Sequence, residues 1–397
     1  MIFEYIHQNN SREIVTLDLT EDIKSDLFRR VDFENKKEFI VKFISRYKRD
    51  EKIVLFDKNH QQLLKYYEEH DINTLENIEN LGDENRLLFF TSGSTGFPIG
   101  AFKSVTNIRS EVEVLSDLVS SIQKIDKVIV TVPFIHIYGI LAGLLLPMQL
   151  DSIKLVVKED FLPYELLEEA KEEGSLIITT PVFIKALSKL SENDDLSQAL
   201  FISSTGPLQK EDVASFEQKY QTKLMQLFGS TETGGIAYKL STTDIWKPLD
   251  GVKITSFEDK LSVSSPFISN YILDGNIKKL KQPFVTEDIV EITNDGFTLL
   301  GRSNKIIKIA GKRISAIAIE NLLESIEGIE KAVVEVIYKK ELLRSEQILI
   351  TLQTTKEIDK KTIKEKINEC YGVLTIPFKL QIVEEIKLSA MGKKILF

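Results

Sequence analysis

Short apolar runs alternate with helix-length amphipathic segments over residues 86–240. The apolar runs are RLLFFTSG, KVIVTVP, SLIITTP, QALFISSTG and KLMQLFGS, and several of them end in Ser, Thr or Gly. Short β-branched runs separated by helices are typical of a parallel sheet whose strands are buried on both faces. Because the loops after the strands of such sheets carry ligand sites, we expect the function to lie there.

The rest of the chain has other patterns. Residues 26–50 predict an amphipathic helix, and residues 52–57 (KIVLFD) predict a strand. Residues 250–300 alternate with period two around turn residues, which predicts antiparallel hairpins. After Gly301 the runs predict a compact α+β domain with helices at 316–328 and 359–372 and strands at 332–338 and 347–354. We therefore expect an α/β protein with a large domain, residues 1–302, and a small domain, residues 303–397.

Residues 128–150 carry no charge if His136 is neutral, and this length exceeds the roughly 18 apolar residues of a membrane-span candidate. However, Pro133 and the sequence that follows it divide the stretch into a short β-branched strand and a short helix that ends near Pro147. The sequence therefore predicts no membrane span.

Composition restricts the class of protein further. The 397 residues include 51 Lys+Arg and 60 Asp+Glu, a net charge of −9, which argues against a general nucleic-acid binder. The single cysteine, Cys370, fits a reducing compartment, and the few histidines give no zinc-ligand spacing. Glu4 stands where a signal peptide would be basic, so we expect a cytoplasmic protein.

Four segments carry candidate chemistry. Residues 91–98 (TSGSTGFP) follow a predicted strand and offer hydroxyl and amide groups to phosphate oxygens, although a Gly/Ser turn is an equal alternative. Residues 228–235 (FGSTETGG) place Glu232 where it could hold a magnesium ion between phosphates, or cap a turn. The other two are residues 301–314, at the expected domain boundary, and the basic Gly392-Lys393-Lys394 near the C-terminus.

In order and spacing, these segments resemble the adenylate-forming superfamily of acyl-CoA synthetases, nonribosomal adenylation domains and firefly luciferase. Residues 91–100 resemble its TSGSTGxPKG loop, residues 228–232 its YGxTE segment, and residues 301–313 its GRxDxxxKxxGxR hinge. Asp288 ends a segment that resembles the superfamily's Thr-Gly-Asp, and residues 133–139 resemble the PxxHxxG segment of acyl- and aryl-CoA ligases.

The resemblance implies a large adenylate-forming domain, a mobile C-terminal lid and a two-step reaction. A carboxylate attacks the α-phosphorus of ATP, with magnesium, and expels pyrophosphate to leave an acyl-adenylate. A thiol, that of coenzyme A or of a carrier-protein phosphopantetheine, then displaces AMP. The implied enzyme is an acid–thiol ligase whose partners are a small carboxylic acid and, for the second acceptor, an acyl or peptidyl carrier protein.

The resemblance also implies residue roles. Lys393 would bridge the carboxylate and the α-phosphate, Glu232 would hold Mg²⁺ and Thr231 would bond the α-phosphate. The lid would rotate about Asn304, which brings Lys308 and Gly311 to the thiol channel. ATP would be bound by Thr91, Ser92, Gly93, Ser94, Thr95, Gly96, Lys103, Phe228, Gly229, Asp288 and Arg302. The alternatives are a hairpin-turn carboxylate for Asp288 and a core aromatic for Phe228.

The chain departs from the superfamily pattern at several positions. Ile99 replaces the lysine of Pro-Lys-Gly, which leaves Lys103 as the expected substitute cation, and Glu287 and Asn304 replace the usual residues. These departures suggest a rival hypothesis, a catalytically idle nucleotide-binding relative that acts as a regulator or scaffold. For the active enzyme we expect an aryl or fatty acid in a pocket lined by His136, Tyr138, Gly139, Val182 and Phe183, the last two having plain core residues as the alternative.

Overall fold

The computed structural model describes residues 2–17, 26–57, 61–91, 99–150, 153–191, 193–302, 306–309, 312–338, 346–371, 378–388 and 394–395. The chain forms two compact units. The first is Met1–Lys253 with Val263–Phe284, and the second is Ile254–Ser262 with Val285–Phe397. The contacts therefore group residues 285–302 with the C-terminal part, whereas we had expected them in the large domain. The predicted boundary passes through residues 303–305, outside the described residues, so the hinge remains a prediction.

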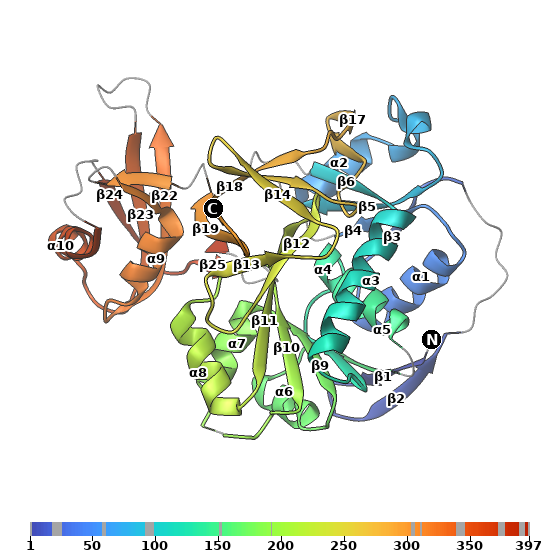
Figure 1. The fold of residues 1–397 in the computed structure, drawn as a ribbon, viewed down its shortest axis with the longest axis horizontal. Coiled ribbons are helices and arrows are strands. Elements are labelled where there is room, and N and C mark those ends of the chain that lie inside the picture. The colour runs from blue at the N-terminus through green and yellow to red at the C-terminus, as the bar shows by residue number, and fades with distance from the viewer. Residues whose placement is uncertain are drawn as a thin grey trace. The chain divides into compact units, whose positions relative to one another are not determined.

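Five parallel strands form the centre of the first unit (Figure 1). They are β7 (Lys127–Val130), β8 (Lys154–Lys158), β9 (Ser175–Thr179), β10 (Ala199–Ser203) and β11 (Lys223–Ser230), in the order β11-β10-β9-β7-β8. Four of them are predicted runs, which confirms the expected parallel sheet. The fifth predicted run is β5 (Asn85–Thr91), which belongs to a different sheet.

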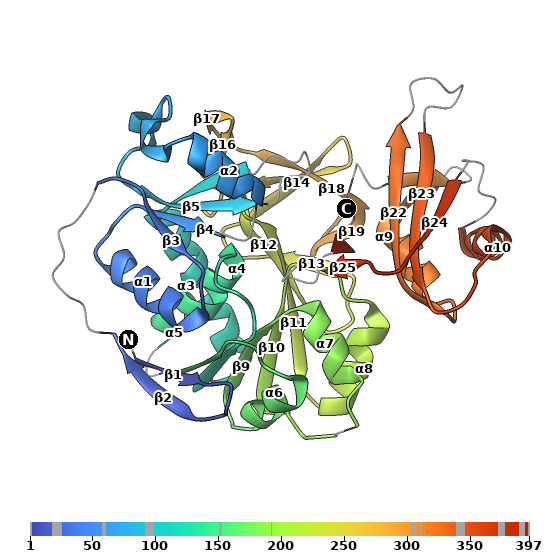
Figure 2. The same ribbon diagram turned by 180° about the vertical axis from the view of Figure 1, so that it is seen from behind.

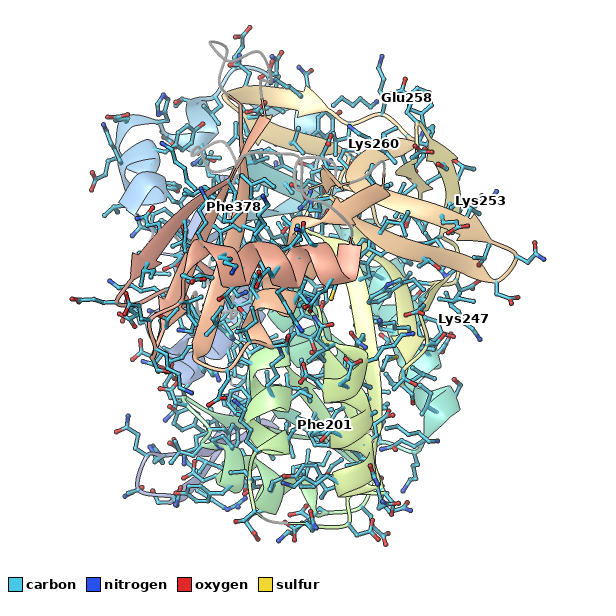
Figure 3. All side chains as sticks on the ribbon, turned by 90° about the vertical axis from the view of Figure 1, so that its left-hand side faces the viewer. Phe201, Lys247, Lys253, Glu258, Lys260 and Phe378 are labelled. Carbon is cyan, nitrogen blue, oxygen red and sulfur yellow. The ribbon has the colours of Figure 1, made fainter. Side chains whose placement is uncertain are left out.

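Helices α6 (Pro163–Ala170), α7 (Pro181–Ser188) and α8 (Lys210–Tyr220) cover one face of this sheet (Figure 1). Their apolar side chains share a core with alternate residues of the strands, such as Ile177, Phe201 and Leu224. The ring of Phe201, which is labelled in Figure 3, meets that of Phe216 edge-on at a centroid distance of 4.9 Å. This packing leaves the loops at the carboxyl ends of the strands to carry polar groups.

Further strands extend the sheet at both sides. Strand β1 (Ile2–Ile6) pairs parallel with β8 and antiparallel with β2 (Arg12–Thr16). On the other side, β11 pairs antiparallel with β12 (Gly234–Leu240), which pairs with β13 (Ile245–Pro248). The β11–β12 connection is therefore a tight turn at the carboxyl end of β11.

A second sheet in this unit has the order β17-β16-β6-β5-β4-β3. Its strands are β3 (Arg29–Asp32), β4 (Ile53–Phe56), β5, β6 (Ile99–Ser104), β16 (Tyr271–Asp274) and β17 (Asn276–Lys279), and helix α2 (Gln61–Glu69) packs against it. Helix α1 (Lys36–Lys48) begins after Asn35, whose side chain accepts from Glu38 N. The helix expected over residues 26–50 is thus wrong in its first part, because residues 29–32 pair in register with β4.

The uncharged stretch at residues 128–150 folds as predicted into a strand and short helical pieces. After β7 come α4 (Ile137–Ile140), a π-helical turn at Leu141–Leu145 and α5 (Leu146–Gln149), packed beside α3 (Val105–Ile122). Within the residues that the structure describes, no helix is long and apolar enough to cross a membrane.

The second unit contains the predicted hairpin and the predicted α+β domain. Strands β18 (Phe284–Thr293) and β19 (Gly296–Arg302) pair antiparallel, with β14 (Lys253–Phe257) and β15 (Lys260–Ser264) following β18 in the sheet order. Next come a hairpin of β20 (Ile306–Ile309) and β21 (Lys312–Ser315), and then α9 (Ala316–Glu324). The period-two pattern therefore located the antiparallel strands correctly.

The C-terminal part of this unit has the expected alternation of strands and helices. Helices α9 and α10 (Lys360–Tyr371) pack with the three-stranded sheet of β22 (Ile329–Tyr338), β23 (Glu346–Thr354) and β24 (Phe378–Val383) (Figure 2). Phe378, which is labelled in Figure 3, has Lys360 Nζ at 4.7 Å from its ring centre. Two short strands, β25 (Lys387–Leu388) and β26 (Lys394–Ile395), pair near the end of the chain.

Candidate functional site

The turn between β11 and β12 carries the two residues predicted to meet the α-phosphate and magnesium, Thr231 and Glu232. Ser230 and Thr233 close it: Ser230 N donates to Thr233 Oγ1 at 3.0 Å, and Thr233 N donates to Ser230 Oγ at 3.2 Å. Glycine is required at its base, because a Cβ on Gly229 would lie 2.2 Å from the carbonyl oxygen of Gly234. Both predicted residues are half-buried in this turn.

Lys103 lies beneath the turn and differs from the prediction. Its side chain is 1% exposed, and Nζ donates to the main-chain oxygens of Phe267 at 2.6 Å and Glu232 at 3.2 Å. Burial lowers the pKa of this amine, and the carboxylate of Glu111 opposes the shift. The expected phosphate-facing cation is therefore an internal lysine that holds the main chain of the Glu232 turn.

Glu111, on α3, is a second buried charge at the same place and was not predicted. Its Oε1 accepts from Gly235 N at 2.7 Å, and burial raises the pKa of its carboxyl. Gly234, at φ +69°, packs so closely that a Cβ there would lie 2.5 Å from Glu111 Oε2. The sequence carries a signal for this residue, because Asn107 and Glu111 are four residues apart and therefore lie on one face of the helix that follows Lys103.

Phe228, the predicted adenine-stacking residue, is half-buried at the end of β11. Its ring lies 5.4 Å, centroid to centroid, from that of Trp246 on β13, and Lys239 Nζ lies 4.7 Å from the Trp246 ring. The side chain thus belongs to a small aromatic group beside the turn, and its contact with adenine remains a prediction.

Asp288 and Arg302 lie opposite each other on the β18–β19 hairpin of the second unit. Arg302 Nε is 3.6 Å from Asp288 Oδ1. Burial raises the pKa of the Asp288 carboxyl, while the Arg302 guanidinium opposes that shift. The structure thus brings together the two residues expected to bind ribose, with an acceptor and a donor side by side.

The residues expected to line the acyl pocket do not act alike. Tyr138 is buried, and its hydroxyl donates to the main-chain oxygens of Ile202 at 2.8 Å and Thr179 at 3.2 Å. Burial of this phenol raises its pKa. Gly139 packs against the chain at Pro133, where a Cβ would come within 2.2 Å of the carbonyl oxygen. Both residues therefore fix the start of α4 on the sheet.

The other three predicted pocket residues occupy different surroundings. His136 precedes α4 and is half-buried. Val182 is 41% exposed, whereas Phe183 packs against the core between the sheet and α6–α8. Phe183 thus fits the alternative of a core residue, and an acyl-binding role remains open for His136 and Val182.

Several predicted residues lie outside the described part of the chain. They are Ser92, Gly93, Ser94, Thr95, Gly96, Asn304, Gly311 and Lys393, and only the main chain is described at Thr91 and Lys308. The neighbour of Lys393 is described: Lys394 Nζ lies 2.5 Å from Glu324 Oε1 and 3.2 Å from Glu320 Oε2, and donates to Ala332 O at 2.7 Å. Lys394 is thus bound to the end of α9 and the start of β22.

The donor set fits magnesium better than a transition metal. Across the described ranges, no three His, Cys, Asp or Glu side chains come together as a metal cluster. Magnesium does not need such a cluster, because it is usually held by one or two carboxylates together with substrate phosphates. Glu232, on a fixed turn, suits this arrangement.

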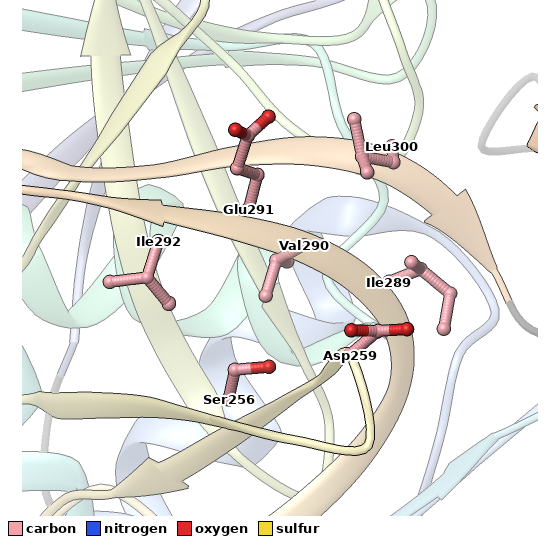
Figure 4. Close-up of a pocket in the computed structure, with 7 residues that line it drawn as sticks. All are labelled: Ser256, Asp259, Ile289, Val290, Glu291, Ile292 and Leu300. Atoms are coloured by element: carbon pink, nitrogen blue, oxygen red, sulfur yellow. The ribbon is translucent and has the colours of Figure 1, made fainter.

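The structure also shows a cavity of about 370 Å³ in the second unit, on the strands around β18 (Figure 4). It contains none of the predicted site residues. Its lining is mostly apolar, with two carboxylates, and consists of Ser256, Asp259, Ile289, Val290, Glu291, Ile292 and Leu300.

Comparison with known proteins gives consistent matches. A family model described as AMP-binding enzyme matches residues 18–276. The 3,4-dihydroxybenzoate–[aryl-carrier protein] ligase of Bacillus anthracis is 24% identical over 333 residues, which cover 83% of this chain and 76% of that protein. The 4-coumarate–CoA ligase of Cereibacter sphaeroides is 25% identical over 247 residues, 61% of this chain and 54% of that protein.

Solved structures match nearly the whole chain. The o-succinylbenzoate coenzyme A synthetase of Bacillus subtilis, in complex with ATP and magnesium ion, has a TM-score of 0.73 at 17% identity, covering 99% of this chain and 95% of that one. An ATP-bound chimera, RpMatB-BxBclM, has a TM-score of 0.76 at 14% identity, covering 99% and 94%. The fold predicted from the motifs is therefore confirmed.

Proposed function

The chain belongs to the AMP-binding enzyme family, and from this premise we propose that it activates a carboxylic acid with ATP and passes the acyl group to a thiol. The superfamily and the acid–thiol ligase class expected from the motifs are thereby confirmed. The observation that carries the proposal is the β11–β12 turn, which holds Thr231 and Glu232 at the carboxyl end of a parallel strand. That is where open α/β sheets bind their ligands.

The chemistry needs positive charge and alignment more than a strong base. A carboxylate is a weak nucleophile, and it must approach the α-phosphorus of a polyanion in line with the leaving pyrophosphate. Magnesium, when bound, would neutralise phosphate charge beside Glu232. The Thr231 hydroxyl would donate a hydrogen bond to the α-phosphate. Asp288 would accept hydrogen bonds from the ribose hydroxyls, and Arg302 would hold that carboxylate ionised.

For the cationic side chain at the reacting atoms, we assign Lys393 rather than Lys394. Lys394 is held by two carboxylates and a main-chain oxygen, all within the C-terminal α+β domain. An ammonium so paired has little charge left for a phosphate, because its partners already neutralise it. This contrast supports the role that motif order gave to Lys393, a bridge between the substrate carboxylate and the α-phosphate during adenylation.

For the substrate and acceptor, the proposal is an aryl or fatty acid and either coenzyme A or a carrier-protein phosphopantetheine. The two curated relatives named above are an aryl-carrier protein ligase and a 4-coumarate–CoA ligase, which favours an aryl acid. The charge of the basic residues Lys305, Lys308, Lys312 and Arg313 would attract an acidic carrier. A cytoplasmic location remains a prediction.

The deciding experiment is ATP–pyrophosphate exchange over a panel of aryl and fatty acids, followed by addition of coenzyme A or a phosphopantetheinylated carrier. We expect exchange with at least one acid and a thioester detectable by mass spectrometry. Glu232→Ala should lower the exchange rate by at least tenfold, since a carboxylate on magnesium makes a charge-assisted contact. Tight ATP binding with no exchange for any acid would instead favour the idle, regulatory relative.

A further inference from the structure

We propose that Lys103 and Glu111 are positioning residues, two buried opposite charges that fix the β11–β12 turn and so set the orientation of Glu232 toward magnesium–ATP. The inference rests on the proposed function for the role of Glu232. It goes beyond that function because it assigns the control of this orientation to side chains that need not touch a ligand.

The first support is the set of groups that Lys103 reaches. Its ammonium joins two segments that are far away in sequence, through Glu232 O at a separation of 129 residues and Phe267 O at 164 residues. Ser269 N donates to the same Glu232 oxygen at 2.8 Å, so both acceptor positions of this carbonyl are used. The main chain at Glu232 is thus held on two sides.

The second support is the position of Glu111 at the other end of the turn. Its Oε1 accepts from Gly235 N, while Oε2 is buried without a hydrogen-bond partner among the described residues and lies against Gly234. A buried carboxylate oxygen without a donor is costly unless a nearby cation compensates for it. The charge of Lys103 supplies that compensation, and each residue lowers the cost of burying the other.

The third support is that one short segment provides the side chains that hold the turn. Lys103 is the next-to-last residue of β6, Ser104 ends that strand and caps α3, and Asn107 Nδ2 donates to Pro266 O at 2.6 Å. Together with Glu111, these side chains bind four main-chain groups of the two segments around residues 232–235 and 266–267. A segment that only filled space would need apolar side chains here, which pack at lower cost than buried charges.

The test compares Lys103→Met with a matched control, Lys36→Met. Lys36 is also buried, 3% exposed, and its Nζ also donates to two main-chain oxygens, of Lys158 at 3.0 Å and Thr131 at 3.2 Å, but it does not contact the turn. For each variant, the free energy of unfolding, the KM for magnesium–ATP, the KM for the acid and kcat are measured. Hydrogen–deuterium exchange of the peptide that covers residues 229–236 is followed without ligand.

We expect Lys103→Met to raise the KM for magnesium–ATP by at least tenfold, with the KM for the acid changed by less than threefold, and to speed amide exchange in residues 229–236. The loss of a hydrogen bond to a charged group changes an affinity by about this factor. Lys36→Met should leave both readouts unchanged. Equal effects of the two lysine variants on KM, or unchanged exchange in Lys103→Met, would overturn the proposal.

A second variant keeps the test decisive if Lys103→Met does not fold. Glu111→Gln retains an acceptor for Gly235 N but removes the charge that balances Lys103, so the turn should still form but be held less firmly. We expect faster amide exchange in residues 229–236 and a smaller rise, about threefold, in the KM for magnesium–ATP. Unchanged exchange in this variant would also refute the role. Because amide exchange needs no ligand, failure of the proposed ligase activity would be recognised separately.

Discussion

The hydroxyl of Tyr138 donates to the main-chain oxygen of Ile202 at 2.8 Å, a bond that ties the start of α4 to strand β10. The same hydroxyl donates to Thr179 O at 3.2 Å, so one side chain joins two adjacent parallel strands near their carboxyl ends. The residue that sequence reasoning assigned to the acyl pocket therefore supports the edge of the sheet on which that pocket would be built.

Tyr138→Phe should lower the free energy of unfolding by about 1–2 kcal/mol, because it removes the one buried phenolic proton that Ile202 O and Thr179 O share, with little change in packing. Urea unfolding would measure this change. Tyr164→Phe is the matched control: Tyr164 is 53% exposed, so its substitution should change stability by less than about 0.5 kcal/mol. Equal small effects of both variants would contradict the structural role of the Tyr138 hydroxyl.

Gly139→Ala should be much more damaging than an ordinary surface substitution. The added Cβ would come within 2.2 Å of Pro133 O, which is main chain and cannot rotate away, so α4 must shift. We expect a loss of about 3 kcal/mol in the free energy of unfolding. Gly206→Ala is the control, because its nearest atom, Pro181 Cγ, would be 3.6 Å away, an ordinary contact. If Gly139→Ala were as stable as Gly206→Ala, the assigned packing at Pro133 would be wrong.

The contrast between strand types shows what the sequence pattern could predict. Strands β7, β9, β10 and β11 are short runs of buried apolar residues, and this hydrophobic pattern is enough to locate them in the sequence. Strand β3, with the sequence RRVD, lies at the edge of its sheet with only Val31 buried, so its pattern does not differ from that of a polar helix. Pairing with β4, which is a tertiary effect, decides its structure.

The candidate site also contains both residues that the sequence could place and residues that it could not. The sequence of residues 223–235 was enough to place Thr231 and Glu232 after a strand. The family resemblance put Arg302 near Asp288, and the structure shows the two opposite each other on β18 and β19. Local sequence was not enough for Lys103, because a lysine near the end of a strand has the same sequence context whether it faces phosphate or main-chain carbonyls. The partners that decide this are 129 and 164 residues away, and no local pattern reveals them.

Lys36 predicts a pH dependence of stability. Burial lowers the pKa of its amine to about 8, below its ordinary value of 10.5. Between these two values the unfolded chain binds a proton that the folded chain does not, so this residue's contribution to the free energy of unfolding rises with pH. Over the full window the rise is at most about 3 kcal/mol, at 1.36 kcal/mol per pKa unit.

Urea unfolding of the wild type and Lys36→Met at pH 7.5 and pH 9.5 would measure this pH dependence of stability. The wild type should gain stability relative to the variant at the higher pH. Lys65→Met serves as the control, because the Lys65 side chain is 76% exposed, and its difference from the wild type should not depend on pH. If the difference in the free energy of unfolding between the wild type and Lys36→Met were the same at both pH values, folding would not lower the pKa of the Lys36 amine.

The two consecutive lysines near the C-terminus give the most direct test of the proposed reaction. Lys393→Ala should reduce ATP–pyrophosphate exchange by at least a hundredfold, because the developing charge at the α-phosphate loses its cation. Thioester formation from a synthetic acyl-adenylate should change by less than threefold, since that half-reaction has no pyrophosphate to displace.

Lys394→Ala should behave differently. It removes the ion pairs to Glu320 and Glu324, so it should lower stability and leave the rate of ATP–pyrophosphate exchange within about threefold of the wild type below the unfolding temperature. Equal loss of both half-reactions in Lys393→Ala would rule out a role confined to adenylation. Loss of exchange in Lys394→Ala instead would reverse the assignment of the two lysines.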